Sequence, residues 1–281
     1  MEIVCLTRFN LEIPSFYEGG EKICLNEDYL QNRFEIFEKY TLPSIISQTK
    51  TDFSWIVMFH EDTPPKFREK IDSFVERCPQ MIPWFLSAED GNKYVLRVSE
   101  YLKDRFPQKK VITIRLDNDD IISKYFLEES EKHFSTPDSS VILSYMNGLQ
   151  YDMERKYLIR YRYPSNHFLA MAKTTDDENN NILCFDHSLI ADYFSKDEIC
   201  FEDNPSAMWV EIISGTNVIN SMNWSFKGIK VSEKVSDSFP MISLPWNGIL
   251  EKMAYYLSAF GKACVFKLVS FRRRLLRKLC K

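Results

Sequence analysis

Glycine is scarce in this sequence, and its cysteines and histidines lack the spacing typical of a metal site. Eight glycines in 281 residues, together with 14% aromatic residues, indicate a dense core with few flexible linkers. The seven cysteines are odd in number and form no CxxC pair, and the four histidines are scattered. This pattern argues against a disulfide framework or a zinc site and favours a reducing, cytoplasmic environment. The start, MEIVCLTRFN, lacks a basic segment, so we do not expect a secretory signal peptide.

Acidic residues are absent after Glu251, whereas nine lysines and arginines follow it. The preceding chain, with 27 basic and 40 acidic residues, contributes −13 to an overall net charge of −4. We therefore expect a globular domain over residues 1–245 and a basic, amphipathic helical tail over residues 246–281. Lys262 and Lys267 leave the tail no uncharged run of bilayer length. It suits a helix lying on the anionic inner face of the cell membrane, or alternatively a helix packed on the body.

Strand-like and helix-like patterns alternate through the first half of the chain. Short apolar runs predict strands over 2–9, 53–60, 81–87 and 109–116. Apolar residues at helical spacing predict helices over 28–48, 64–77, 92–106 and 123–134. The alternation predicts βαβ units and an α/β fold with a mainly parallel sheet, in which ligands bind at the carboxyl ends of the strands. Further on, 139–153 and 155–164 are typical of two strands joined by a turn.

The segment VITIRLDNDDIIS, residues 111–123, places three carboxylates at the end of a predicted strand. Such close charges repel one another unless a cation lies among them. Asp117 and Asp119 face the same side because strand side chains repeat every two residues, and the pair suits Mg²⁺ or Mn²⁺ bridging a diphosphate. The alternative is a solvated acidic turn in which Asp120 or Ser123 caps the next helix. One cap does not need three acids and an upstream Arg115.

Several motifs, in order, resemble those of the putative rhamnosyltransferase family of bacteria, which has a GT-A-like glycosyltransferase fold. They are TRFN, NRFEIFEKYTLPSIISQT, FSWIVMFHEDTPP and IRLDNDD, with MWVEIISGTNV near the end of a match over about residues 1–225. The resemblance implies a nucleotide-sugar donor at the strand ends. Asp119 would be the principal metal ligand, with Asp117 near the metal or the ribose and Asp120 towards the acceptor. Thr7 and Arg8 would lie against the base or the phosphates.

The chain departs from the family pattern at two positions, where His60 and Ser214 stand in place of an acid and a histidine. These departures support, as an alternative, a catalytically silent scaffold that binds sugar or nucleotide. A second alternative uses the same acids in a metal-dependent phosphohydrolase or nucleotidyltransferase. The main prediction is sugar transfer from a nucleotide-diphosphate donor to a saccharide or lipid-linked acceptor, in the synthesis of surface polysaccharide.

An inverting transfer needs a general base near the acceptor hydroxyl. Glu211 and Asp203 are the leading candidates, although Asp203 also suits a turn and Glu211 a paired strand charge. Three further candidates are Asp186, His187 and Glu202.

Arginine and aromatic residues near these acids have two interpretations each. Arg8 and Arg115 suit either neutralising a diphosphate or pairing with the acids. Trp209 suits the core or the wall of a substrate pocket. His133 and His167 are expected at the surface. A body of net charge −13 argues against a nucleic-acid partner, despite the interleaved YRYP over 161–164.

Overall fold

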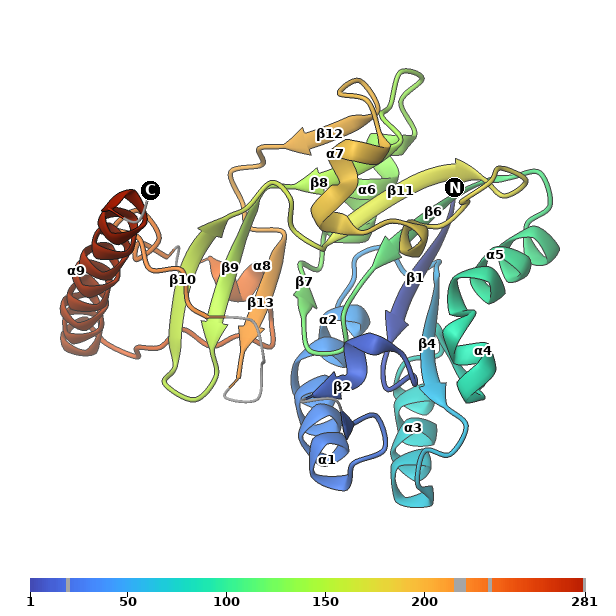
Figure 1. The fold of residues 1–281 in the computed structure, drawn as a ribbon, viewed down its shortest axis with the longest axis horizontal. Helices are drawn as coiled ribbons and strands as arrows, with labels where there is room; N and C mark the ends of the chain where they lie inside the picture. Colours follow the sequence, from blue (N-terminus) through green and yellow to red (C-terminus); the bar gives the residue numbers. More distant parts are fainter. Residues whose placement is uncertain (19–20, 215–220, 232–233, 280–281) are drawn as a thin grey trace.

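The computed structural model describes residues 1–18, 21–214, 221–231 and 234–279. Seven strands form the main sheet in the order β12-β8-β11-β6-β1-β4-β5, drawn in Figure 1. Their bounds are β1 (Glu2–Arg8), β4 (Ser54–His60), β5 (Met81–Leu86), β6 (Lys110–Arg115), β8 (Ile142–Tyr145), β11 (Leu169–Thr174) and β12 (Ile199–Glu202). Strand β11 runs antiparallel to both of its neighbours, and the other pairs are parallel. The predicted mixed, mainly parallel sheet is confirmed.

Helices cover both faces of this sheet, as the alternating patterns predict (Figure 1). Their bounds are α1 (Glu27–Ile36), α2 (Leu42–Ile46), α3 (Pro65–Arg77), α4 (Ala88–Asn92), α5 (Tyr94–Arg105), α6 (Phe126–Phe134) and α7 (Ile190–Tyr193). The predicted helix over 28–48 is α1 and α2 joined by a π-helical turn, Phe37–Thr41. Asn26 caps α1, its side chain accepting a hydrogen bond from the Tyr29 amide at 2.9 Å. Three short 3₁₀ helices are η1 (Pro14–Phe16), η3 (Ile182–Cys184) and η4 (His187–Leu189).

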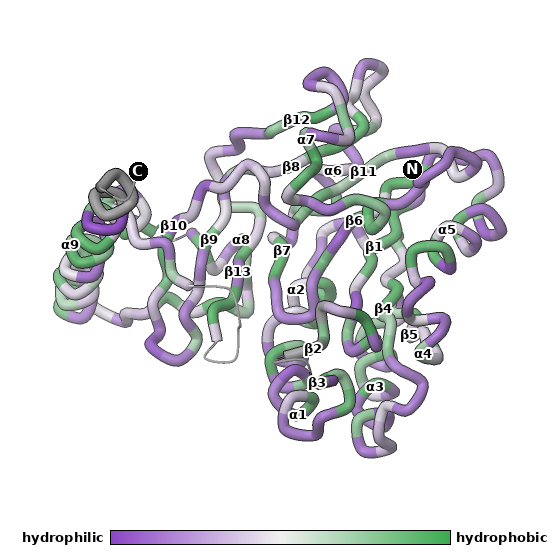
Figure 2. The backbone as a smooth tube through the Cα atoms, viewed as in Figure 1, coloured by the Kyte–Doolittle hydropathy of each residue, from purple (hydrophilic) through white to green (hydrophobic). Residues whose placement is uncertain are grey.

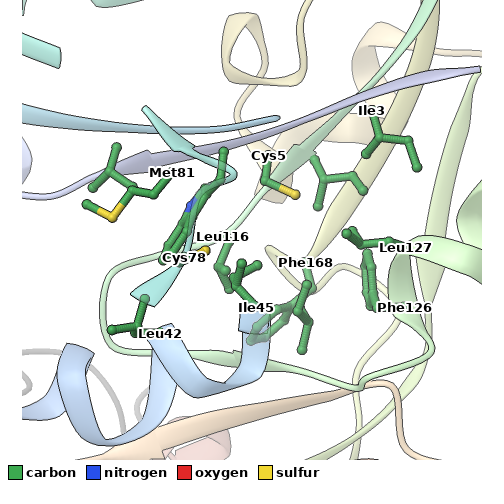
Figure 3. Packing of buried hydrophobic residues seen from close by; sticks show 14 of the residues in the cluster. Ile3, Cys5, Leu42, Ile45, Cys78, Met81, Leu116, Phe126, Leu127 and Phe168 are labelled. Atoms are coloured by element: carbon green, nitrogen blue, oxygen red, sulfur yellow. The ribbon is translucent and has the colours of Figure 1, made fainter. Parts of the chain in front are cut away.

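Strand β1 shows how the sheet separates two apolar cores. Ile3 and Cys5 face the layer that holds α1, α2, α3 and α6, and Val4 and Leu6 face the layer that holds α5. Figure 3 shows the first of these cores, with Leu42, Phe126 and Phe168 among its residues. Because both faces are covered, β1 carries a continuous apolar run from Ile3 to Leu6, with its charged residues at the ends, and Figure 2 shows hydrophobic colour along this strand.

A second sheet of four strands, in the order β10-β9-β13-β7, lies beside the first. Its strands are β7 (Ile121–Ile122), β9 (Asn147–Asp152), β10 (Tyr157–Arg162) and β13 (Trp209–Ile213). The strand predicted over 139–153 is therefore divided at Met146: β8 belongs to the main sheet and β9 to the second. The hairpin prediction is confirmed for β9 and β10. A third, two-stranded sheet joins β2 (Tyr17–Glu18) to β3 (Glu21–Lys22).

The tail forms one long helix, α9 (Ile249–Leu279), which follows the short helix α8 (Val235–Ser238). Helix α9 stands beside β10, at the end of the molecule away from β1 (Figure 1). Tyr255 and Ala259 are buried in a core shared with the second sheet, and the Tyr157 and Ser258 hydroxyls are 2.6 Å apart. No helix of the described chain combines the length and apolar character needed to cross a membrane.

Gly148 of β9 lies directly against the ring of Trp209, so we expect it to tolerate no side chain. A Cβ there would lie 2.2 Å from the ring. Phe168 stacks on the ring at a centroid distance of 4.9 Å, and the indole N–H donates to the Tyr145 carbonyl at 2.7 Å, so the ring is held in place. Gly148→Ala should therefore cost roughly 1–3 kcal/mol of unfolding free energy. Thermal unfolding measures this loss.

Gly261 of α9 is the matched control, because a Cβ built there meets nothing within 4 Å. Gly261→Ala should leave the protein unchanged or stabilise it by up to about 1 kcal/mol, since alanine favours helix over glycine. An unchanged melting temperature in Gly148→Ala would contradict the close packing at Trp209.

Candidate active site

The acidic loop, residues 116–120, connects β6 of the main sheet to β7 of the second. Buried Asn118 fixes its shape: its side-chain amide donates to the Phe9 carbonyl at 2.7 Å. The backbone carbonyl of Asn118 accepts a hydrogen bond of 3.2 Å from the hydroxyl of Thr41, which lies in the π-helical turn. With Asn118 anchored inward, the neighbouring aspartates are free to make separate contacts. The loop lies at the carboxyl end of β6, where the fold class places ligands.

Each of the three aspartates contacts a cationic side chain of its own. Arg115 holds Asp117 with two hydrogen bonds of 3.1 and 2.9 Å, and Arg8 lies 3.5 Å away. The partner of Asp119 is Arg33 of α1. The partner of Asp120 is His167, with an imidazole nitrogen 2.6 Å from the carboxylate. The protein thus supplies the positive charge that three adjacent carboxylates require.

The pairing has opposite effects on the pKa values of Asp117 and Asp120. Burial opposes ionisation of Asp117, but the guanidinium groups of Arg115 and Arg8 prevail and hold its pKa well below the usual range. Burial dominates at Asp120 and raises its pKa to about 7, although His167 opposes the rise. Burial alone would lower the pKa of His167, but the carboxylate of Asp120 raises it. The folded pair therefore keeps its protons to a higher pH than the unfolded chain.

His187 extends this network on the far side of Arg115. Its Nδ1 lies 3.1 Å from an Arg115 guanidinium nitrogen, and burial together with that guanidinium lowers the pKa of His187 to about 4. Neutral His187 therefore accepts the hydrogen bond and positions Arg115 towards Asp117. His187 was a candidate base in the sequence, and the structure places it against Arg115 instead.

Asp117, Asp120 and His167 can together hold a divalent cation. One ligand atom from each lies within 4.8 Å of the others. Two carboxylates and one imidazole suit a first-row ion such as Mn²⁺ better than Mg²⁺, which favours oxygen ligands. Asp119, which the resemblance makes the principal ligand, is outside this cluster because its carboxylate contacts Arg33. Its role as a ligand stays a prediction.

A cavity of about 300 Å³ lies next to the acidic loop, and we call it the aromatic cavity. Its lining combines rings with hydrogen-bonding groups: Gln150, Tyr161, Tyr163, Asn166, His167, Phe168, Trp209, Glu211, Ser221 and Asn223. His167 belongs both to this lining and to the Asp120 pair, so the cavity adjoins the acidic loop. Aromatic faces beside amide and carboxylate groups are suited to binding a sugar.

Glu211 and Trp209, both on β13, line the aromatic cavity. The Glu211 carboxylate accepts a hydrogen bond from Gln150 at 2.6 Å. The next residue, Ile212, donates its amide to Asp120 at 3.2 Å, which fixes β13 against the acidic loop. Trp209 is 1% exposed and packs in the core, as one of its two interpretations requires, and its role as the wall of a substrate pocket stays a prediction.

Two other predicted residues lie apart from the cavity. Asp203 is exposed in the loop after β12, where it pairs with Asn147 at 2.8 Å and Arg162 at 3.4 Å. Thr7 is wholly buried. Its hydroxyl donates to the Leu116 carbonyl at 2.7 Å and accepts from the Trp55 indole at 2.9 Å. The structure therefore gives Thr7 a place in the core beneath the loop and contradicts its direct contact with a base or phosphate.

The sequence predictions missed Arg33 and misplaced His167. His167 was expected at the surface, whereas its side chain is 16% exposed and packs against Asp120. It lies two residues before β11, whose position beside β6 could not be read from the sequence. Arg33 lies in the quoted motif NRFEIF, yet nothing in the helical pattern shows that it faces Asp119 across 86 residues. His60, the departure at the last residue of β4, is buried, and its Nδ1 accepts a hydrogen bond from the Asp62 amide at 3.0 Å.

A family model described as "Putative rhamnosyl transferase" matches residues 2–224. The chain therefore belongs to this family, and the resemblance inferred from its motifs is confirmed. Family and fold together place the chain among the glycosyltransferases. No curated protein sequence matches it significantly.

Three solved structures resemble the chain weakly. S. aureus TarS 1-349 is 12% identical over 75% of this chain and 60% of that one, with a TM-score of 0.42. Mouse xyloside xylosyltransferase 1 is 14% identical over 52% and 53%, with a TM-score of 0.29. Inositol-1-phosphate CTP transferase from T. maritima is 11% identical over 76% and 84%, also with a TM-score of 0.29. The chain spans about three fifths of the TarS fragment. The family match, rather than these likenesses, carries the assignment.

The raised pKa values of Asp120 and His167 predict a stability that falls with rising pH. The Asp120–His167 pair contributes to the free energy of unfolding at low pH. This contribution is lost as the pH rises through the pKa values of the folded state, and the pKa of Asp120 is about 7. Asp120→Asn keeps the shape but removes the ionisation. Its stability relative to the wild type should therefore increase between pH 5 and pH 8, by at most about 1.4 kcal/mol per pH unit for each proton.

Urea unfolding of both proteins at several pH values, with a chelator present, measures this difference. Asp138→Asn, at an exposed position after α6, is the control and should show no such trend. A constant gap between Asp120→Asn and the wild type would contradict the raised pKa of Asp120.

Proposed function

We propose that the protein transfers a sugar from a nucleotide-diphosphate donor to a saccharide or lipid-linked acceptor, in the synthesis of surface polysaccharide. The observation that carries this proposal is the placement of the aromatic cavity directly beside the acidic loop, with His167 common to both. The donor's diphosphate would lie at the acidic loop and the acceptor sugar in the cavity. Arg8 and Arg115, which contact Asp117, could bring positive charge to the diphosphate.

A divalent ion, Mg²⁺ or Mn²⁺, would neutralise charge on the departing diphosphate. Asp117, Asp120 and His167 are the residues whose arrangement fits it. Asp119 would take part only by leaving Arg33, so we assign Asp119 the positioning of α1 against the loop.

Glu211, rather than Asp203, is the base we propose for an inverting displacement. It lies in the cavity that would receive the acceptor, and Gln150 orients its carboxylate. It would accept the proton of the acceptor hydroxyl as that oxygen bonds to the anomeric carbon of the sugar and the bond from the sugar to the diphosphate breaks, with the nucleoside diphosphate leaving. Asp203, exposed beside Arg162, has no such position.

Metal-dependent donor binding tests this assignment. A matching nucleotide-sugar with Mn²⁺ should raise the melting temperature by mass action, and Asp117→Asn or Asp120→Asn should abolish the metal-dependent part. Asp119→Asn should retain it. Differential scanning fluorimetry with a panel of nucleotide-sugars, with and without Mn²⁺, gives the measurement.

Glu211→Gln provides the matched control, because it should bind the donor normally and yet lose transfer. If Asp119→Asn alone lost the Mn²⁺-dependent rise in melting temperature, Asp119 would be the metal ligand, as the family resemblance implies. Donor binding without any transfer by the wild type would favour the silent scaffold, and release of free phosphate or incorporation of the nucleotide would favour the other enzyme classes.

We also propose that α9 rests on the anionic inner face of the cell membrane. Large apolar side chains along it are exposed, among them Leu250 at 78%, Leu257 at 74% and Leu268 at 69%. All charged residues that follow Glu251 in the sequence are basic. An exposed apolar face with basic residues suits an interface of acyl chains and anionic head groups.

Vesicle binding tests the membrane contact. The protein should co-sediment with phosphatidylglycerol vesicles and much less with phosphatidylcholine, and added salt should weaken binding. The double variant Leu250→Ser with Leu257→Ser should bind at least about tenfold more weakly, because each leucine loses its burial in lipid. Leu96→Ser, at a 54% exposed position on α5, is the control. Equal binding by the double variant and the wild type would exclude α9 as the contact.

A further inference from the structure

A second cavity, of about 500 Å³, lies between β10 and the segment 223–228, and we call it the arginine cavity. Arg160, Arg162 and Lys227 line it, and none of its described lining residues is acidic. Arg160 and Arg162 are two residues apart in β10 and therefore project from the same face of the strand. The chain up to Glu251 has a net charge of −13, whereas the side chains around this cavity carry positive charge.

Two of these cations have no carboxylate partner in the described chain. Arg162 pairs with Asp203 at 3.4 Å, whereas no ion pair within the described residues involves Arg160 or Lys227. Gly228 lets the 223–228 segment lie this close to β10, since a Cβ there would be 2.6 Å from the Arg160 carbonyl. The Arg160 amide donates to the Gly228 carbonyl at 2.7 Å and fixes the approach. The backbone therefore builds a cavity in which two cationic groups remain available for an anion.

The arginine cavity joins the aromatic cavity to an apolar groove under α9. Tyr161 and Asn223 line both the arginine and the aromatic cavity. Trp224, Ser225 and Phe266 line both the arginine cavity and the groove. The groove, of about 370 Å³, has as its other lining residues Phe226, Ala263, Lys267, Ser270 and Phe271.

We infer that this series of cavities binds an acceptor saccharide carried on a lipid phosphate or diphosphate. The sugar would occupy the aromatic cavity, the phosphate would contact Arg160 and Lys227, and the lipid chain would enter the groove beside Phe266. The order of chemistry along the cavities matches the order of groups in such a molecule. This inference rests on the proposed sugar transfer and names the class of its acceptor. Phosphate accepts charge-assisted hydrogen bonds from arginine, and an acyl or prenyl chain gains by burial of its apolar surface.

Binding of farnesyl diphosphate, a soluble lipid diphosphate, tests the inference without any need for activity. Isothermal titration calorimetry should give tighter binding for farnesyl diphosphate than for inorganic pyrophosphate or for farnesol. Arg160→Gln and Lys227→Gln should each weaken it by about tenfold, the effect of losing one charge-assisted contact. Lys196→Gln, which removes an exposed charge between α7 and β12, should have no effect. Equal affinity in Arg160→Gln and the wild type would overturn the inference.

The groove is tested separately. Phe266→Ser should weaken farnesyl diphosphate but leave pyrophosphate unchanged. Leu96→Ser is the matched control, because it alters an exposed apolar residue of α5 outside the described lining of the groove. Pyrophosphate binding as tightly as farnesyl diphosphate would overturn the lipid part of the inference, and farnesol binding as tightly would overturn the phosphate part.

The donor site must be distinguished, because it too would bind a diphosphate. Asp117→Asn should impair nucleotide-sugar binding and spare farnesyl diphosphate, and Arg160→Gln should do the reverse. Competition by a nucleoside diphosphate that removes all farnesyl diphosphate binding would place the probe at the acidic loop and overturn the inference. Failure of every nucleotide-sugar to bind, with farnesyl diphosphate still dependent on Arg160, would instead count against the proposed transfer alone.

Discussion

The pairing of each loop aspartate with a separate cation is the interaction on which the site depends. Three carboxylates within four residues cannot be packed together in a protein interior unless positive charge compensates them. The compensating groups come from α1, β1, β6 and the turn that leads into β11, and Asp120 also accepts a hydrogen bond from the Ile212 amide in β13. Charge balance in one short loop therefore fixes both sheets and α1 relative to one another, and the loop becomes the point where they meet.

His167 gives that meeting point its chemical consequence. The same imidazole contacts Asp120 in the loop and lines the aromatic cavity, so any change of charge at the loop is felt at the cavity wall. Arg115 has a comparable position between Asp117 and the neutral ring of His187. Two imidazoles with opposite pKa shifts thus flank one cluster: the one facing a carboxylate is raised and the one facing a guanidinium is lowered. Local partners, rather than residue type, decide which ring carries charge.

What the sequence could predict, and what it could not, follows from the range of the interactions. Continuous apolar runs and helical periodicity depend on neighbours in the chain, so β1, β4, β6, α3 and the acidic loop were found from pattern alone. The cations opposite Asp119 and Asp120 lie 86 and 47 residues away, and no local pattern shows that α1 or the start of β11 faces the loop. The division of 139–153 at Met146 was also hidden, because both halves are strand-like and only their partners differ. Thr7 follows the same rule: it lies within β1, and the Trp55 indole that donates a hydrogen bond to its hydroxyl belongs to another strand, β4.

The second sheet and α9 extend the site in a single direction, away from the main sheet (Figure 1). The carboxylates of the loop are electrostatically unsuited to an anion without a cation between them, whereas Arg160 and Lys227 attract one directly. Two anionic groups would therefore bind to this protein by different means. The diphosphate of the donor would need the positive charge of a divalent ion at the loop. The phosphate of the acceptor would contact the positive side chains of β10 and the segment 223–228 directly. Beyond the second lies the apolar face of α9, which water solvates poorly. The apolar groove thus follows the cationic cavity, and an amphiphilic acceptor would bind in one orientation, with its sugar towards His167 and Glu211.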